Sequence, residues 1–93
     1  MRYSGGHLVV PPSVTARPVK EDLVLVDLDR GEYFSLNESG RAIWEGIGEV
    51  EDLDELIMRL QSDFEEDPEN IREDVEQLIA ELLDRQLLLL GRP

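Results

Sequence analysis

The chain contains no cysteine, which excludes a disulfide framework and any metal site built on thiolates. Its single histidine, His7, lies near the N-terminus without the partners that a proton relay or a metal site needs. No run of about 18 apolar residues is present, as a membrane-spanning helix would require, and the first residues lack the apolar segment of a signal peptide. These absences predict a cytoplasmic protein with no metal and no cofactor.

Sequence patterns for catalysis are missing as well. There is no glycine-rich phosphate loop and no GxSxG nucleophile elbow, and Ser35 and Ser39 have no base nearby in the sequence to activate them. The acids of residues 63–67 lack the alternating ligand spacing and the central glycine of a calcium loop. We therefore expect no catalytic residue and no enzyme activity, and the remaining motifs point to a binding module.

Positive charge is scarce: 9 basic residues stand against 22 acidic ones, for a net charge of -13. Nucleic-acid binding depends on Lys and Arg side chains that neutralise phosphates, so the composition argues against a reader of DNA or RNA. The segment Glu49–Glu76 holds 13 acids against two arginines, yet its apolar periodicity indicates acidic helix surface rather than a disordered tail. This acidity suits either a partner with basic residues or simple solubility.

The length allows one small domain with one modest core. We expect residues 1–12 to be a flexible N-terminal segment, because they begin small and polar and end at Pro11-Pro12. The single domain is then expected to span residues 13–90. Strands are expected at residues 14–20, 23–28 and 32–36.

Three helices are expected after the strands. Asn37, Asp52 and Asp67 each precede an apolar-periodic segment and are expected to cap one helix, while Gly46 and Gly48 are expected to end the first. Strands followed by helices predict an α+β fold with a three-stranded antiparallel sheet. The apolar tail at residues 87–90 is compatible with either a last packed turn or a short strand.

The strand at residues 32–36 is expected at an edge of the sheet. Phe34 and Leu36 share one face, and Tyr33 and Ser35 share the other. No proline or lysine blunts this edge, so its main-chain groups are either a liability or a docking site. The third helix carries a core stripe of Ile71, Val75, Leu78 and Leu82 that Ile79 and Leu83 widen on one side.

Two motifs resemble the PqqD-like family, the peptide-recognition elements of ribosomal natural-product biosynthesis. They are LVLVDLDRGEYFSLNESGRAIW, from Leu23 to Trp44, and DVEQLIAELLDRQLL, from Asp74 to Leu88. The resemblance covers about residues 13–90 and departs at Gln86, where the family often has glycine. The length and the Ile43-Trp44 pair are most similar to the free-standing leader-binding members of lasso-peptide biosynthesis.

This resemblance implies a winged helix-turn-helix-like fold and a non-catalytic adaptor. The leader of a precursor peptide would add a strand to the third strand, beside the third helix, and would be delivered to a leader peptidase or another maturation enzyme. An alternative is a peptide chaperone for a radical SAM enzyme in PQQ or other peptide-derived biosynthesis; a winged-helix DNA binder is less favoured. The residues implied to bind the peptide are Tyr33, Phe34, Ser35 and Leu36 on the strand and Asp74, Leu78, Ile79 and Leu83 on the helix.

Each of these residues also has a plainer interpretation. Core packing is the favoured alternative for the side chains of Phe34, Leu36 and Leu78. A solvated helix acid is an equal alternative for Asp74. Tyr33 is the better candidate for direct side-chain contact with a peptide, because it falls on the opposite face from Phe34 and Leu36.

Overall fold

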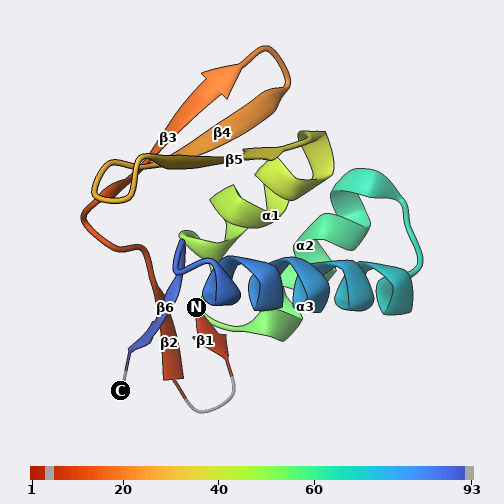
Figure 1. Ribbon diagram of the computed structural model, residues 1–93. Helices are drawn as coiled ribbons and strands as arrows, with labels where there is room; N and C mark the ends of the chain where they lie inside the picture. Colours follow the sequence, from red (N-terminus) through yellow and green to blue (C-terminus); the bar gives the residue numbers. More distant parts are fainter. Residues whose placement is uncertain (4–5, 92–93) are drawn as a thin grey trace.

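The main sheet consists of three antiparallel strands, as predicted from the sequence. A computed structural model describes residues 1–3 and 6–91, and in it β3 (Val14–Val19), β4 (Asp22–Asp27) and β5 (Glu32–Leu36) pair in that order (Figure 1). The β4–β5 register runs from Leu23↔Leu36 to Asp27↔Glu32. The predicted edge position of β5 is therefore confirmed.

The turn between β4 and β5 explains why a carboxylate falls on the buried face of β4. Asp27 is 5% exposed, and its Oδ1 accepts from the N–H groups of Asp29 and Arg30 at 3.0 and 3.3 Å. Its carbonyl accepts from Gly31 N–H at 2.8 Å, and Gly31 adopts the positive φ of +68° that closes the turn. Asp27 thus organises the turn while its buried oxygens stay hydrogen-bonded.

The helices are α1 (Glu38–Ile47), α2 (Leu53–Phe64) and α3 (Pro68–Asp84). The three predicted caps are confirmed, because each carboxylate or amide oxygen accepts from a first-turn N–H. Asn37 caps α1 through Gly40, and the equivalent bonds of α2 and α3 start from Asp52 and Asp67. This strand-then-helix order is the predicted α+β, winged helix-turn-helix-like fold.

No helix in the described part of the chain is long and apolar enough to cross a membrane.

One glycine has a different role from the one predicted. Gly46 does not end α1, which continues through it to Ile47 and is capped by Gly48. A Cβ at Gly46 would lie 2.4 Å from Cδ1 of Leu56 on α2, closer than a side-chain carbon can approach. Gly46 therefore allows the close packing of α1 and α2.

A second small sheet joins the two ends of the chain. Strands β1 (Arg2–Tyr3), β2 (Gly6–Val9) and β6 (Leu89–Gly91) are antiparallel in the order β1-β2-β6, and Figure 1 shows them together below α3. Residues 1–12, expected to be flexible, thus supply two strands in their described part. The tail at residues 87–90 is a turn that continues into a strand, with Leu87 and Leu88 N–H groups donating to Leu82 O at 2.9 and 3.2 Å.

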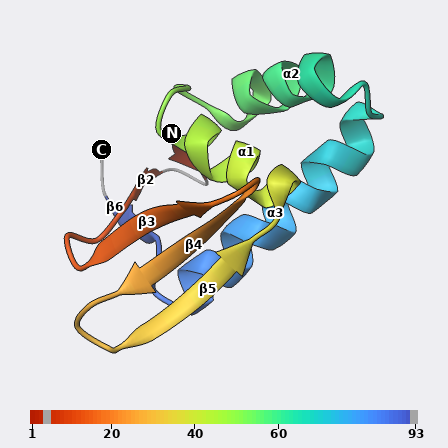
Figure 2. The ribbon, with the colours of Figure 1, turned by 90° about the horizontal axis from the view of Figure 1, so that it is seen from above.

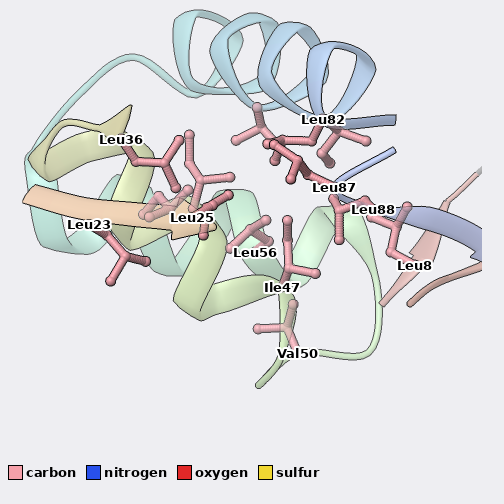
Figure 3. Close-up of a cluster of buried hydrophobic side chains, with 14 of the residues drawn as sticks. Leu8, Leu23, Leu25, Leu36, Ile47, Val50, Leu56, Leu82, Leu87 and Leu88 are labelled. Carbon is pink, nitrogen blue, oxygen red and sulfur yellow. The ribbon is translucent and has the colours of Figure 1, made fainter. Parts of the chain in front are cut away.

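The core joins both sheets to the three helices. Leu25, Leu56, Ile79, Leu82 and Leu88 are almost completely buried. Figure 3 shows Leu8 at the end of this cluster, next to Leu88, and Leu8 is 8% exposed. The N-terminal strand therefore covers one end of the core.

We expect Leu8→Ala to lower the free energy of unfolding by about 2 kcal/mol, because it leaves a cavity beside Leu88. Val9→Ala is the matched control: Val9 is the next residue of β2 but is 46% exposed, so its effect should stay within about 0.5 kcal/mol. Urea denaturation measures both. Equal and negligible effects would show that the N-terminal segment does not stabilise the domain.

Candidate functional site

The candidate site starts from the unpaired edge of β5. Leu28 N–H donates to Ser13 O at 2.9 Å, and because main-chain groups alternate along a strand, Val24 and Val26 face β3 while Leu23, Leu25 and Asp27 face β5. In the β4–β5 register the partners of those three are Leu36, Phe34 and Glu32. The N–H and C=O groups of Tyr33 and Ser35 therefore point away from the sheet.

The opposite edge of the same sheet is blocked. The same alternation turns the main-chain groups of Thr15 and Arg17 toward β4, and those of Val14, Ala16 and Pro18 away from it. Pro18 has no N–H, so the outer edge of β3 lacks a donor at that point. Of the two edges of this sheet, β5 is the one that offers alternating donors and acceptors without interruption.

Two side chains that directly follow α3 contact β5 and the turn before it. In Figure 2 β5 is the outer strand of its sheet and overlaps the C-terminal half of α3, which Figure 1 places below it. The guanidinium of Arg85 lies 4.7 Å from the ring centroid of Phe34, a favourable cation–π distance. Arg30 in the β4–β5 turn donates to the side-chain amide of Gln86. A peptide added to β5 would therefore lie beside α3.

The predicted strand residues differ in what they can offer to a partner. Tyr33 is 74% exposed, whereas Leu36 is 3% exposed. Ser35 is exposed and Phe34 half-buried, and the main-chain groups of Phe34 and Leu36 face β4. Only Tyr33 and Ser35 therefore present main-chain groups at the edge, and Leu36 is a core residue in both side chain and backbone.

The predicted helix residues separate in the same way. Asp74 is exposed and Leu78 and Leu83 are half-buried, so their side chains reach the surface of α3. Ile79 is completely buried in the core. Its proposed contact with a peptide would require a side chain that the fold uses for packing.

A hollow lies beyond the end of β5 and includes two of the predicted helix residues. This α1–α2–α3 cavity has a volume of about 320 Å³. The apolar periodicity of the helices does not predict this cavity. Phe64, at the end of α2, is an aromatic ring that remains 40% exposed. The residues that line it are Asn37, Ser39, Gly40 and Ile43 of the α1 region, Leu60, Phe64 and Glu66 of the α2 region, and Ile71, Asp74 and Leu78 of α3.

The electrostatics of the cavity are acidic. Glu66 and Asp74 line it, and Asp74 takes part in none of the ion pairs that the described residues form. The nearest cation along α3, Arg72, is already bound to Asp54 of α2 at 2.6 Å, and this hydrogen bond raises the pKa of Arg72. Among the described residues no group of three or more acids and histidines is placed to hold a metal ion.

Two solved structures are similar to this chain over nearly its whole length. One is described as TbiB1 in complex with the TbiA(beta) leader peptide; it is 23% identical, with a TM-score of 0.77, and the match covers 85% of this chain and 92% of that one. The other is described as lasso peptide synthetase B1 complexed with the leader peptide, at 20% identity, a TM-score of 0.82, and coverage of 89% and 98%. At these identities the similarity shows the shared fold.

The sequence comparison identifies the family. No curated protein matches the chain significantly. The family model of coenzyme PQQ synthesis protein D (PqqD) matches residues 22–88. That span contains both motifs that suggested the resemblance, together with β5, the cavity and α3. The chain therefore belongs to the PqqD family.

Proposed function

We propose that this protein binds the leader segment of a ribosomally made precursor peptide by strand addition to β5. The observation that carries the proposal is the open edge of β5, where the N–H and C=O groups of Tyr33 and Ser35 point away from the sheet. The complexes of both similar structures with leader peptides support it. The protein acts as a non-catalytic adaptor.

The edge supplies affinity without sequence preference. Tyr33 and Ser35 together offer two donors and two acceptors to an extended peptide. At about 0.5–1.5 kcal/mol net for each hydrogen bond, the ladder contributes about 2–6 kcal/mol before the cost of ordering the peptide. Selectivity must then come from side chains, because alternate residues of the peptide face α3. The predicted site residues whose side chains are at least partly exposed, and so could provide it, are Tyr33, Phe34, Ser35, Asp74, Leu78 and Leu83.

Delivery to a separate enzyme follows from an adaptor role. A bound leader holds the rest of the precursor close to whichever enzyme the adaptor contacts, which raises the effective substrate concentration. A leader peptidase of lasso-peptide biosynthesis is the partner that we favour, in view of the two similar structures. The alternative client, a PQQ-type precursor with its radical SAM enzyme, is supported by the description of the family model. The genes beside the coding sequence would separate the two.

Amide hydrogen exchange tests the mode of binding. With the leader of the precursor encoded beside its gene, we expect the amides of Tyr33 and Ser35 to become protected on binding. The amides of Phe34 and Leu36, which face β4, are the internal control because they are protected beforehand. Calorimetry should show binding with no turnover by this protein alone. No heat at high concentration, or protection confined to another strand, would refute the proposal.

A further inference from the structure

The α1–α2–α3 cavity lies next to the C-terminal end of β5. Asn37, which directly follows β5, lines the cavity, and Gly40 and Ile43 of α1 extend it. Asp74 and Leu78 of α3 form the facing wall. A peptide that pairs with β5 and continues past its end therefore runs over this cavity.

The cavity combines an apolar lining with acidic groups. Ile43, Leu60, Phe64, Ile71 and Leu78 line it with apolar side chains. The carboxylates of Glu66 and Asp74 belong to the same lining. Lys and Arg side chains are complementary to this lining, because their aliphatic stems pack on apolar surface while the charged head stays at a polar rim. The volume of about 320 Å³ is at the lower limit of ligand pockets, which suits one long side chain.

No cation in the described part of the chain forms an ion pair with the acids of the cavity. Glu66 accepts only a 3.4 Å hydrogen bond from the Asn70 amide, and Asp74 has no hydrogen bond or ion pair among the described residues. Arg72 is held by Asp54. The net charge of -13 adds a field that attracts cations and repels acids. A Leu side chain would fill the apolar part but leave both carboxylates without a partner.

We infer that the α1–α2–α3 cavity is a specificity subsite for a Lys or Arg side chain of the bound peptide. Its aliphatic stem packs against Phe64 and Leu78, and its charged head pairs with Asp74 and Glu66. The inference rests on the proposed function, because the peptide reaches the cavity by pairing with β5. It adds a sequence preference to the proposed function: the bound peptide carries a basic residue at one fixed distance from the segment that pairs with Tyr33 and Ser35.

A displayed library of random peptides, long enough to span β5 and the cavity, tests this. Selection on the wild-type protein should enrich peptides with Lys or Arg at one fixed position, and synthetic versions with Gln there should bind about three- to tenfold more weakly. Selection on Asp74→Lys should move the preference at that position to Asp or Glu. Asp74 is exposed, so the fold should tolerate the change, and Asp74→Asn, which should only lose the preference, is a milder second variant.

Two further variants make the outcomes distinct. Glu73→Lys is the matched control, because Glu73 is an exposed acid one residue away that does not line the cavity; it should leave the preference for a basic residue unchanged. Counter-selection on Ser35→Pro defines which peptides depend on the β5 edge. If the edge-dependent peptides show no preference for a basic residue, or if Asp74→Lys leaves that preference unchanged, the subsite is refuted while the proposed function stands. The absence of any edge-dependent peptide would overturn the proposed function itself.

Discussion

Ser35→Pro is expected to weaken leader binding by about ten- to a thousandfold while the domain still folds. Proline removes the Ser35 N–H, which points away from the sheet, so no bond to β4 is lost. The carbonyl of the added peptide strand then faces a ring instead of a donor, and an unsatisfied group at such a site costs about 1–3 kcal/mol beyond the lost hydrogen bond. Calorimetry or fluorescence anisotropy with the leader measures the loss, and circular dichroism confirms the fold.

Ala16→Pro is the matched control for this experiment. Ala16 is exposed on β3, and its N–H points outward from the opposite edge of the same sheet. Both substitutions therefore place proline at an outward-facing position of an edge strand, where the ring is tolerated, and both should cost similar stability. Only Ser35→Pro should affect binding. Normal binding by a folded Ser35→Pro protein would show that the peptide docks elsewhere.

Leu25→Ala is expected to lower the free energy of unfolding by about 2–5 kcal/mol, the range found when a fully buried leucine is truncated. Leu25 is in the middle of β4 and is 0% exposed, and Figure 3 shows its side chain within the core cluster. Since a small domain is stable by only about 5–15 kcal/mol, this is a large share of the total. The midpoint of thermal unfolding should fall by at least about 10 °C.

Leu28→Ala is the control for that change. It deletes the same atoms from a leucine just past the end of β4 that is 66% exposed, so its effect should stay within about 0.5 kcal/mol. Urea and thermal denaturation measure both variants. Similar losses for the two would mean that the domain depends on the β4–β5 turn as much as on its core.

The local features of the fold could be predicted from sequence because each is decided within a few residues. Asn37, Asp52 and Asp67 cap helices because their side chains reach N–H groups two or three residues away. The edge position of β5 follows from the short connections, which keep consecutive strands adjacent.

Features that join distant parts of the chain could not be predicted in this way. The second sheet pairs residues near position 8 with residues near position 90, and each of its strands is too short to show a pattern of its own. Gly46 resembled a helix stop because its contact with Leu56 is invisible in sequence. Leu36 and Ile79 were both implied to bind a peptide, with core packing favoured for the Leu36 side chain, and their burial depends on how the sheet meets the helices.

For the proposed site, the sequence alone determined that Glu32–Leu36 is an open strand and that Asp74–Leu83 belongs to a helix with a broad apolar face. The short connections place this strand at the edge, and the 3.6-residue period of the apolar side chains sets the broad face of the helix. The tertiary structure decided that Tyr33 and Ser35 are the residues with outward main-chain groups, because that choice depends on which residues of β4 already pair with β3. It also decided that Asp74 and Leu78 share a cavity with Ile43, Leu60 and Phe64, because three helices must pack before that cavity exists.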